Sequence, residues 1–457
     1  MNDKIETLIV RQRTFFETGV TKSVAFRREQ LSRLKKSIIE NENHIMDALK
    51  ADLNKAPFEA FASEIGVVLK ELSYMLSHVG RLSRPKRVAP TLAQFPASCR
   101  IIPEPYGVVL VMSPWNYPFL LTLSPVIGAM AAGNCILVKP SNYSPNVSKV
   151  IGDIIRGTFP SEYIDMVEGG REVNTSLLVQ RFDYIFFTGS ETVGKTVMAA
   201  AAKNLTPVTL ELGGKSPCIV DETANIFLAA KRISWGKFLN AGQTCIAPDY
   251  ILVHNSVKEL LIEEILHNIH EFYGEKPHMN EELPRIITKK HFERLLALIS
   301  SESDVCGGSF NVETMQIEPT LLTSATWESA AMGEEIFGPV LPVLTYNNLE
   351  DAITRIKMGA KPLALYLFTG SGTTKQMVLE QVSFGGGCIN DTVMHMPTTR
   401  MPFGGVGQSG MGAYHGKTSF LTFSHMKSLL IKGTFIDVPL RYPPYKNKLP
   451  LVKRLMR

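Results

Sequence analysis

The sequence predicts an α/β protein built on a mainly parallel sheet. Between residues 101 and about 220, apolar strand patterns alternate with helical patterns, as they do in βαβ units. The clearest unit joins an apolar strand at 107–112, a helix at 118–132 and a second apolar strand at 135–138. Because a chain of 457 residues can bury more than one core, we expect two or more domains.

The remaining elements follow in order along the chain. Segments 24–53 and 58–79 place apolar residues three and four positions apart with charges between them, which predicts amphipathic helices. Strands at 184–187 and 216–220 continue the first α/β region. The alternation of strands and helices resumes from 223 to 378, which predicts a second α/β region.

Composition excludes several classes of protein. A net charge of +5 without a dense lysine and arginine run in the body of the chain argues against nucleic-acid binding. Residues 105–138 carry no charge, but their prolines and glycines interrupt any membrane helix. The charged N-terminus lacks the apolar run of a secretory signal. In the basic tail at 446–457, a solvated state is favoured over contact with an acidic membrane surface.

The cysteines indicate the compartment. Six are scattered along the chain without a CxxC pair or a zinc-site spacing, which predicts reduced thiols, a cytoplasmic location and no bound metal.

Three polar residues suggest covalent catalysis. Cys245 ends a run of small and polar residues at 240–245, unlike a cysteine packed in a core. Glu211 lies beside a di-glycine that lets backbone approach a ligand, and Asn116 is an uncharged donor held between two prolines. Together they predict a nucleophile, a general base and an oxyanion donor. Each residue alone has a plainer interpretation, as an inert loop cysteine, a solvated acid and a turn-forming asparagine.

A second set of signals indicates a dinucleotide site. An apolar strand leads through Gly189 to a predicted helix at 191–202, for which Ser190 is the expected N-cap. Gly189 and Gly194 bracket the first turn, where free N–H groups suit a pyrophosphate. Lys139 ends a buried strand, at the edge where open α/β sheets bind ligands. An ordinary capped helix and a surface lysine are the alternatives.

Five motifs occur in order along the chain: Pro114-Trp115-Asn116-Tyr117-Pro118-Phe119, Leu210-Glu211-Leu212-Gly213-Gly214-Lys215-Ser216-Pro217, Gly242-Gln243-Thr244-Cys245, Glu335-Ile336-Phe337-Gly338-Pro339 and Pro402-Phe403-Gly404-Gly405-Val406-Gly407. In order and rough spacing they resemble the NAD(P)-dependent aldehyde dehydrogenase superfamily. The resemblance is strongest to its class 3 branch, the fatty and aromatic aldehyde dehydrogenases. It runs from about residue 27 to about residue 444.

The resemblance implies an aldehyde dehydrogenase-like fold in three parts with a short tail, and a homodimer. A Rossmann-like cofactor-binding domain would comprise 1–82 and 105–210, and an α/β catalytic domain would comprise 211–420. A small β bridging element for oligomerisation would comprise 83–104 and 421–445, including a strand near 434–438. The basic C-terminal tail would be 446–457.

The resemblance also implies a reaction, the oxidation of a medium-chain, long-chain or aromatic aldehyde to the carboxylic acid. Cys245 would attack the aldehyde, the Asn116 amide and the Cys245 N–H would hold the oxyanion, and Glu211 would activate the water that hydrolyses the thioester. The cofactor, NAD or NADP, would be bound by Trp115, Lys139, Gly189, Ser190, Glu191, Thr192, Val193, Gly194, Leu212, Glu335 and Phe337.

Two residues depart from the family pattern. Asn142 stands where many NAD-preferring members have a glutamate, so we expect NADP to be accepted as well as NAD. Arg400 lies on the loop that flanks the family's substrate tunnel, where relatives have small or neutral residues, and argues against a purely fatty substrate.

Three other functions share some of these features. A CoA-acylating dehydrogenase is disfavoured by Glu211, because such members often lack that base. A cysteine hydrolase leaves the dinucleotide signals unexplained. An inactive homologue is disfavoured because Cys245, Glu211 and Asn116 are all present.

Overall fold

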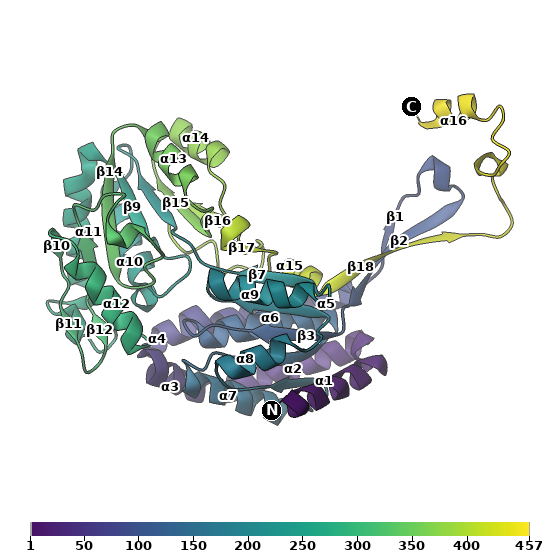
Figure 1. Ribbon diagram of the computed structural model, residues 1–457, viewed down its shortest axis with the longest axis horizontal. Coiled ribbons are helices and arrows are strands. Elements are labelled where there is room, and N and C mark those ends of the chain that lie inside the picture. The colour runs from purple at the N-terminus through teal and green to yellow at the C-terminus, as the bar shows by residue number, and fades with distance from the viewer. Residues whose placement is uncertain (1, 457) are drawn as a thin grey trace.

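Two mainly parallel sheets lie side by side, and a narrow arm of strands extends away from them (Figure 1). The computed structural model describes residues 2–456. The chain begins at the first sheet and ends at the far end of the arm (Figure 1).

The first sheet has the strand order expected of an open dinucleotide-binding sheet. The first of its parallel strands along the chain lies in the middle of the sheet. The next two strands pair on one side of it, and the two after that pair on the other side. The crevice at such a reversal, outside the carboxyl ends of the strands, is where open α/β sheets bind ligands. In spatial order the strands are β17 (Gly410–Met411), β7 (Val208–Glu211), β6 (Tyr184–Thr188), β3 (Val108–Met112), β4 (Cys135–Lys139) and β5 (Ile164–Met166).

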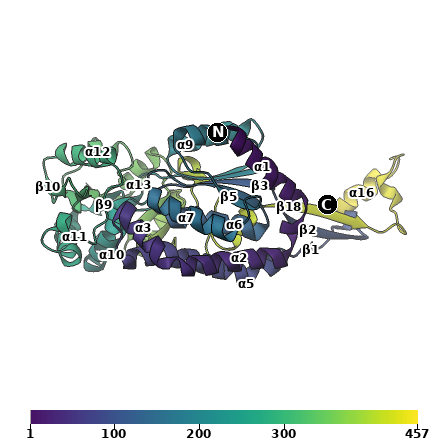
Figure 2. The same ribbon diagram turned by 90° about the horizontal axis from the view of Figure 1, so that it is seen from below.

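Helices cover both faces of this sheet. Figure 2 shows α6 and α7 between the sheet and the outer helices α2 and α5, while α1 and α9 lie on the opposite face. Because α6 is enclosed on both sides, all of its residues are buried, which explains its uninterrupted apolar sequence. Within residues 2–456, no helix combines the length and apolar character needed to cross a bilayer. The helices are α1 (Asn2–Glu17), α2 (Val24–Glu40), α3 (Glu42–Leu53), α4 (Pro57–Ala60), α5 (Gly66–Leu82), α6 (Pro118–Ala132), α7 (Pro145–Thr158), α8 (Arg171–Leu178) and α9 (Glu191–Ala202).

Two predicted helices begin and end at the residues expected from the sequence. The helices expected at 118–132 and 191–202 have those bounds. The pattern at 24–53 is two helices, because the chain breaks at Asn41. The pattern at 58–79 is interrupted by a wider π-helical turn over Phe61–Ile65, which precedes α5.

The second sheet is also parallel, apart from one edge strand that pairs antiparallel. In spatial order it comprises β10 (Val305–Cys306), β13 (Thr320–Leu322), β14 (Val340–Tyr346), β9 (Tyr250–His254), β8 (Pro217–Val220), β15 (Ala364–Phe368) and β16 (Gly386–Ile389). A separate hairpin pairs β11 (Phe310–Asn311) with β12 (Gln316–Ile317). The helices of this half are α10 (Ile226–Phe238), α11 (Lys258–Tyr273), α12 (Lys289–Ser300), α13 (Leu349–Met358) and α14 (Gly372–Gln381).

The arm is a three-stranded antiparallel sheet of β1 (Lys86–Val88), β2 (Ala97–Pro105) and β18 (Ser424–Lys432). The strand expected near 434–438 is wrong, because that segment is irregular. Pairing with β2 runs from Ser424 to Lys432 and uses the whole length of β2, so no partner remains for the residues that follow. The tail ends in the short helix α16 (Leu449–Met456) beside the tip of the arm (Figure 1).

One segment crosses between the halves. Residues 410–422, of which 410–420 were assigned from sequence to the catalytic domain and 421–422 to the bridging element, lie on the first sheet. There β17 pairs with β7, and α15 (Lys417–Thr422) packs on α6. Gly410 permits this crossing, because it has φ +146° and a side chain there would collide with the carbonyl of Leu210.

Candidate active site

The predicted catalytic and cofactor residues meet where the two sheets face each other. Four residues lie at or just beyond the carboxyl ends of adjacent strands in the first sheet. Lys139 ends β4, Thr188 and Glu211 are register partners that end β6 and β7, and Asn116 follows β3. Adjacent parallel strands end at the same edge, so these residues share one side of the sheet.

The second sheet contributes residues that precede its strands. Cys245 lies between α10 and β9, Glu335 lies before β14, and Gly213 lies before β8. These three strands are neighbours, since β9 pairs with both β8 and β14. The site therefore joins the carboxyl edge of one sheet to the amino edge of the other.

The loop that carries Cys245 has an unusual backbone. Asn240, Ala241 and Gly242 have φ values of 52°, 51° and 72°, three consecutive left-handed residues. Such conformations are unfavourable for residues with a side chain and persist where the surrounding structure holds them. Gly242 is required, because a Cβ at that position would collide with the carbonyl of Gly338. The loop thus turns sharply just before the cysteine.

Asn116 is bonded directly to the cysteine loop. Its side-chain Nδ2 donates to the carbonyl of Gln243 at 2.9 Å. Its own carbonyl accepts from Asn240 Nδ2 at 2.8 Å. The amide has two N–H groups, and the second has no acceptor within residues 2–456. The first N–H binds Gln243, two positions before Cys245, so the free N–H lies close to the nucleophile. A free N–H donor in this place suits a developing oxyanion.

The Cys245 thiol lies within electrostatic range of two carboxylates. Burial raises its pKa well above the ordinary range, and the charges of Glu335 and Glu211 raise the pKa further. The backbone N–H groups of Cys245 and Ile246 face the sulfur and act in the opposite direction. The thiol is therefore protonated in the ligand-free protein, and both predicted acids lie within electrostatic range of it.

Glu211 is a buried carboxyl without a hydrogen-bond partner. Its side chain is 2% exposed, and neither carboxylate oxygen is bonded within residues 2–456. Burial holds its pKa well above its usual range. A carboxyl group in this state can accept a proton near neutral pH, which a solvated surface acid cannot do efficiently. The alternative of a solvated acid does not hold.

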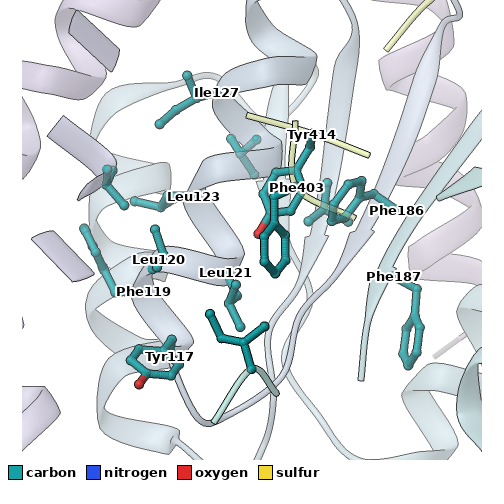
Figure 3. Close-up of a cluster of buried hydrophobic side chains, with 14 of the residues drawn as sticks. Tyr117, Phe119, Leu120, Leu121, Leu123, Ile127, Phe186, Phe187, Phe403 and Tyr414 are labelled. Atoms are coloured by element: carbon teal, nitrogen blue, oxygen red, sulfur yellow. The ribbon is translucent and has the colours of Figure 1, made fainter. Parts of the chain in front are cut away.

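Aromatic residues enclose the thiol. Charge on Cys245 adds to the raised pKa of Tyr117, Tyr366 and Tyr414, so all three hydroxyls lie near the sulfur. Tyr117 is bonded to Thr244 at 2.7 Å, and the Tyr414 ring lies 5.9 Å from the Phe403 ring. Figure 3 shows Tyr117, Phe403 and Tyr414 in a buried apolar cluster with Leu121 of α6. Two of the tyrosines near the cysteine thus belong to an apolar cluster.

The loop before β14 holds Glu335 against the second sheet. Lys215 Nζ lies 2.5 Å from Asp249 Oδ2, and Asp249 Oδ1 accepts from the N–H of Ile336 at 2.9 Å. A side chain at Gly213 would collide with the carboxylate of Glu335, so the glycine makes room for it. One oxygen of Glu335 is buried without a partner, and burial raises its pKa to about 8.

Two aromatic residues lie beside this loop. Phe337 has a left-handed φ of 51°, and the rings of Trp115 and Phe337 lie 5.4 Å apart at 79°. The strained backbone of Phe337 turns its ring toward the loop that precedes α6.

The predicted pyrophosphate turn is the start of α9. Ser190, Glu191, Thr192 and Val193 are exposed there, so their N–H groups are accessible to a ligand. Ser190 occupies the N-cap position, but its side chain makes no capping bond, because the hydroxyl does not reach the first-turn N–H groups. Gly189 precedes this turn; at Gly194 a Cβ would lie 2.7 Å from the buried Leu212 side chain, so glycine lets α9 approach β7.

The other basic and polar positions lie near this edge. Lys139 is buried at the end of β4, has no acidic partner within residues 2–456, and burial lowers its pKa to about 8. Asn142 is exposed three residues later and faces Gly170. Arg400 is exposed and lines a groove of about 790 Å³ with Lys35 and Lys70.

Sequence reasoning missed two residues with unpartnered polar atoms. Lys237 of α10 is 0% exposed, its Nζ has no bond within residues 2–456, and burial lowers its pKa to about 8. Thr188 has a buried hydroxyl without a partner next to Gly189. Lys237 carries no distinctive signal in the sequence, because α10 also contains Lys231 and Arg232. Thr188 carries only the weak signal of its place at a strand end.

Comparison with known proteins agrees with this geometry. The aldehyde dehydrogenase family model matches residues 3–429. The 4,4'-diaponeurosporen-aldehyde dehydrogenase of Staphylococcus aureus is 49% identical over 99% of each chain. Aldehyde dehydrogenase family 3 member A2 of Rattus norvegicus is 43% identical over 96% of this chain and 91% of the relative. A Canis lupus familiaris enzyme named aldehyde dehydrogenase, dimeric NADP-preferring, is 42% identical over 98% of this chain and 99% of the relative.

A solved structure gives the same result for the fold. The substrate-bound state of Staphylococcus aureus AldH superimposes with a TM-score of 0.98 over 99% of both chains, at 48% identity. The site geometry, the family match and this superposition agree, and the chain belongs to the aldehyde dehydrogenase family, in its class 3 branch, as an oxidoreductase that oxidises aldehydes with NAD(P).

Proposed function

We propose that Cys245, Asn116 and Glu211 carry out aldehyde oxidation in the roles predicted from the sequence. The Cys245 sulfur attacks the aldehyde carbon, and the carbonyl electrons move to oxygen. The thiol proton passes to Glu211, whose raised pKa and free oxygens suit it to receive a proton. The free N–H of Asn116 and the backbone N–H of Cys245 stabilise the oxyanion of the resulting thiohemiacetal.

The residues at the sheet edge fit a nicotinamide dinucleotide. Three features call for a ligand: the accessible N-terminus of α9, the unpaired Lys139 and the unbonded oxygen of Glu335. We assign the pyrophosphate to the turn from Gly189 to Gly194, the adenosine ribose to Lys139, and the nicotinamide ribose to Glu335. Trp115, Leu212 and Phe337 line the same region. When bound, NAD(P)⁺ supplies the hydride acceptor that converts the thiohemiacetal to a thioester.

Glu211 also completes the reaction. Glu211 first passes the thiol proton to solvent, and its carboxylate then takes a proton from water. The hydroxide oxygen bonds to the thioester carbon and the C–S bond breaks, which releases the carboxylic acid and leaves a Cys245 thiolate that takes up the proton from Glu211. The observation that carries this role is a carboxyl group 2% exposed with both oxygens unbonded. An unbonded buried carboxyl is costly, and a site that uses it as a base gives a reason for it.

The apolar surroundings of Cys245 favour a lipophilic aldehyde, long-chain aliphatic or aromatic. Tyr117 and Tyr414 lie near the sulfur and belong to a buried cluster with Phe403 and Leu121 (Figure 3), whose side chains suit an apolar chain better than a charged one. The Staphylococcus aureus relative is named for a 4,4'-diaponeurosporen-aldehyde.

Pre-steady-state kinetics with Glu211→Gln test the mechanism. We expect one equivalent of reduced cofactor per site in a rapid burst, followed by turnover slowed by roughly 10²-fold or more, because the thioester lacks its base. Wild-type enzyme is the control and should turn over without that accumulation. Unchanged steady-state turnover would show that another group activates water. Formation of acyl-CoA by wild-type enzyme, faster than acid formation, would assign the CoA-acylating reaction instead.

We also propose a homodimer assembled through the arm. β18 is the edge strand of the arm, and Leu429, Leu430 and Ile431 are exposed on it. An exposed apolar edge strand is a ready partner for another strand, and the Canis lupus familiaris relative is named dimeric. Light scattering should give twice the chain mass, and Leu430→Lys should shift the population to monomer. A monomeric wild type would refute this assembly.

We also propose a reducing compartment for the protein and a solvated state for its basic tail. The six cysteines are free thiols, which supports a reducing compartment such as the cytoplasm. The tail helix α16 exposes Leu451 and Leu455 beside Lys453 and Arg454, a composition that would also suit an acidic membrane surface. Co-sedimentation with anionic vesicles, unchanged on deletion of 449–457, would leave the tail as a solvated segment.

A further inference from the structure

A buried ion pair lies directly beneath the oxyanion donor. Lys55 follows α3 and Glu64 lies in the π-helical turn before α5, so both come from the N-terminal helices. Lys55 Nζ and Glu64 Oε1 are 2.5 Å apart, and both side chains are 0% exposed. A fully buried pair is costly to desolvate and is weak evidence for stability, so its position calls for another explanation.

Each partner of the pair also binds the backbone that carries Asn116. Lys55 Nζ donates to the carbonyl of Asn116 at 3.1 Å. Glu64 Oε2 accepts from the N–H groups of Phe119 and Leu120 at 2.9 and 3.2 Å, at the N-terminus of α6. The pair therefore clamps both ends of the turn from Asn116 to Leu120. The Lys55 ammonium also lies 4.0 Å from the centre of the Tyr117 ring, inside that turn.

The same group of helices holds the cysteine loop. Glu59 Oε1, in α4, accepts from the backbone N–H of Asn240 at 2.9 Å. Asn240 Nδ2 in turn donates to the Asn116 carbonyl, which Lys55 also binds. The oxyanion turn and the left-handed start of the cysteine loop are thus fixed to one another through a single carbonyl and two charged side chains.

We propose that Lys55 and Glu64 are positioning residues for catalysis, which set the side-chain amide of Asn116 relative to the Cys245 sulfur. The inference rests on the proposed function of Asn116. Neither residue touches the reacting atoms; they act on the backbone from which the amide projects. A displacement of an oxyanion donor by about an ångström is enough to lose most of its contribution to the rate.

The test uses the double variant Lys55→Met/Glu64→Gln. It removes both charges together, so neither is left buried alone, and glutamine retains an oxygen for the N–H groups of Phe119 and Leu120. We expect kcat to fall about 10- to 100-fold, on the scale of losing an oxyanion donor, with little change in KM for aldehyde or in affinity for NAD(P). Circular dichroism and a thermal midpoint close to wild type verify folding.

A cycle with Asn116→Ala separates positioning from a general loss of stability. If the pair acts through Asn116, adding Lys55→Met/Glu64→Gln to Asn116→Ala should lower kcat by less than 3-fold. Independent, multiplicative losses would refute the proposal. If the double variant alone keeps wild-type kcat, the positioning proposal also fails. If Asn116→Ala itself leaves kcat unchanged, the proposed role of Asn116 fails, whatever the pair does.

A matched control comes from another ion pair in the same half of the protein. Arg13 of α1 binds Asp183 at 2.8 Å, and Asp183 accepts from the N–H of Val108 at the start of β3, away from the carboxyl edge. Arg13→Met should lower the thermal midpoint and leave kcat within 2-fold of wild type. If the double variant does not fold, Lys55→Gln, which keeps a donor to the Asn116 carbonyl, should retain kcat better than Lys55→Met; equal losses would refute the proposal.

Discussion

Two pairs of buried, chargeable side chains differ in how they are bonded. Lys55 and Glu64, behind the Asn116 backbone, are paired with each other and with backbone groups. Glu211 and Lys237 are as deeply buried but have no bonding partner within residues 2–456. Lys55 and Glu64 hold the backbone in place, whereas the unbonded atoms of Glu211 and Lys237 are free to bond to substrate, water or cofactor.

The burial of a charged side chain does not by itself show whether the side chain reacts or supports the structure. Leaving a buried polar group unbonded costs about 1–3 kcal/mol, so each such group calls for an explanation. Unbonded buried atoms also occur away from the site, in Gln12 and Ser144 for example, but Glu211 and Glu335 carry theirs at the edges where the two sheets meet. At this site the bonding state, and not the burial, distinguishes the proposed base from the ion pair that supports it.

The largest expected effect concerns the nucleophile. Cys245→Ala should reduce aldehyde oxidation to the background rate, because no other group in the site can form the thioester. Affinity for NAD(P) should remain near wild type, since the change removes no group assigned to the dinucleotide. Titration of cofactor fluorescence and a turnover assay measure the two effects. Substantial turnover by this variant would overturn the mechanism.

The next prediction compares the two buried carboxyls by stability. Glu64→Gln leaves Lys55 buried without its counter-charge and should lower the free energy of unfolding by about 3–5 kcal/mol. Glu211→Gln removes a carboxyl that has no partner and should change that free energy by no more than about 1 kcal/mol. Denaturant unfolding of both variants measures the contrast. Equal losses would mean that the two groups are not distinguished by their bonding.

The oxyanion donor should have an effect of intermediate size. Asn116→Ala should lower kcat by about 10²-fold, the scale seen for removing one such donor. The aldehyde KM should change little, because the bond forms fully only when charge develops on the oxygen. A change confined to KM would make Asn116 a residue that positions the ground-state substrate.

A smaller effect is expected at the adenosine ribose. Asn142 is exposed and uncharged beside the site of Lys139, so we expect both NAD and NADP to be used. Asn142→Glu places a negative charge near the 2′-phosphate and should favour NAD by about 10- to 30-fold, or about 1–2 kcal/mol. The ratio of kcat/KM for the two cofactors measures the shift. A wild-type enzyme that uses NAD alone would show that discrimination lies elsewhere.

The smallest effect is a pH dependence of stability. Burial raises the pKa of Glu335 from 4.5 to about 8, so the folded protein keeps this proton where the unfolded chain loses it. The stability from this group is full below pH 4.5 and is lost as pH rises through about 8. Glu335→Gln should raise the thermal midpoint by about 1–3 °C at pH 8 and have little effect at pH 4.5. A midpoint difference that does not vary with pH would refute this assignment.

The sequence alone determined the local elements and the chemically distinctive residues. Helices α6 and α9 have their predicted bounds, because their apolar patterns and the flanking glycines, prolines and serine act over short distances. Cys245, Glu211 and Asn116 were found because polar residues beside glycines and prolines are informative without any contact map. The roles assigned to them are still predictions for the experiments above to decide.

Only the tertiary structure decided which distant residues act together. Lys55 and Glu64 are an ordinary lysine and glutamate in the sequence, and their ion pair arises because a π-helical turn brings Glu64 to the N-terminus of α6. The orphaned state of Glu211 and Lys237, the crossing of β17 to the first sheet and the placement of β18 are likewise non-local. Hydrogen-bond satisfaction depends on every neighbour in space, and periodicity along a chain reports only the neighbours in sequence.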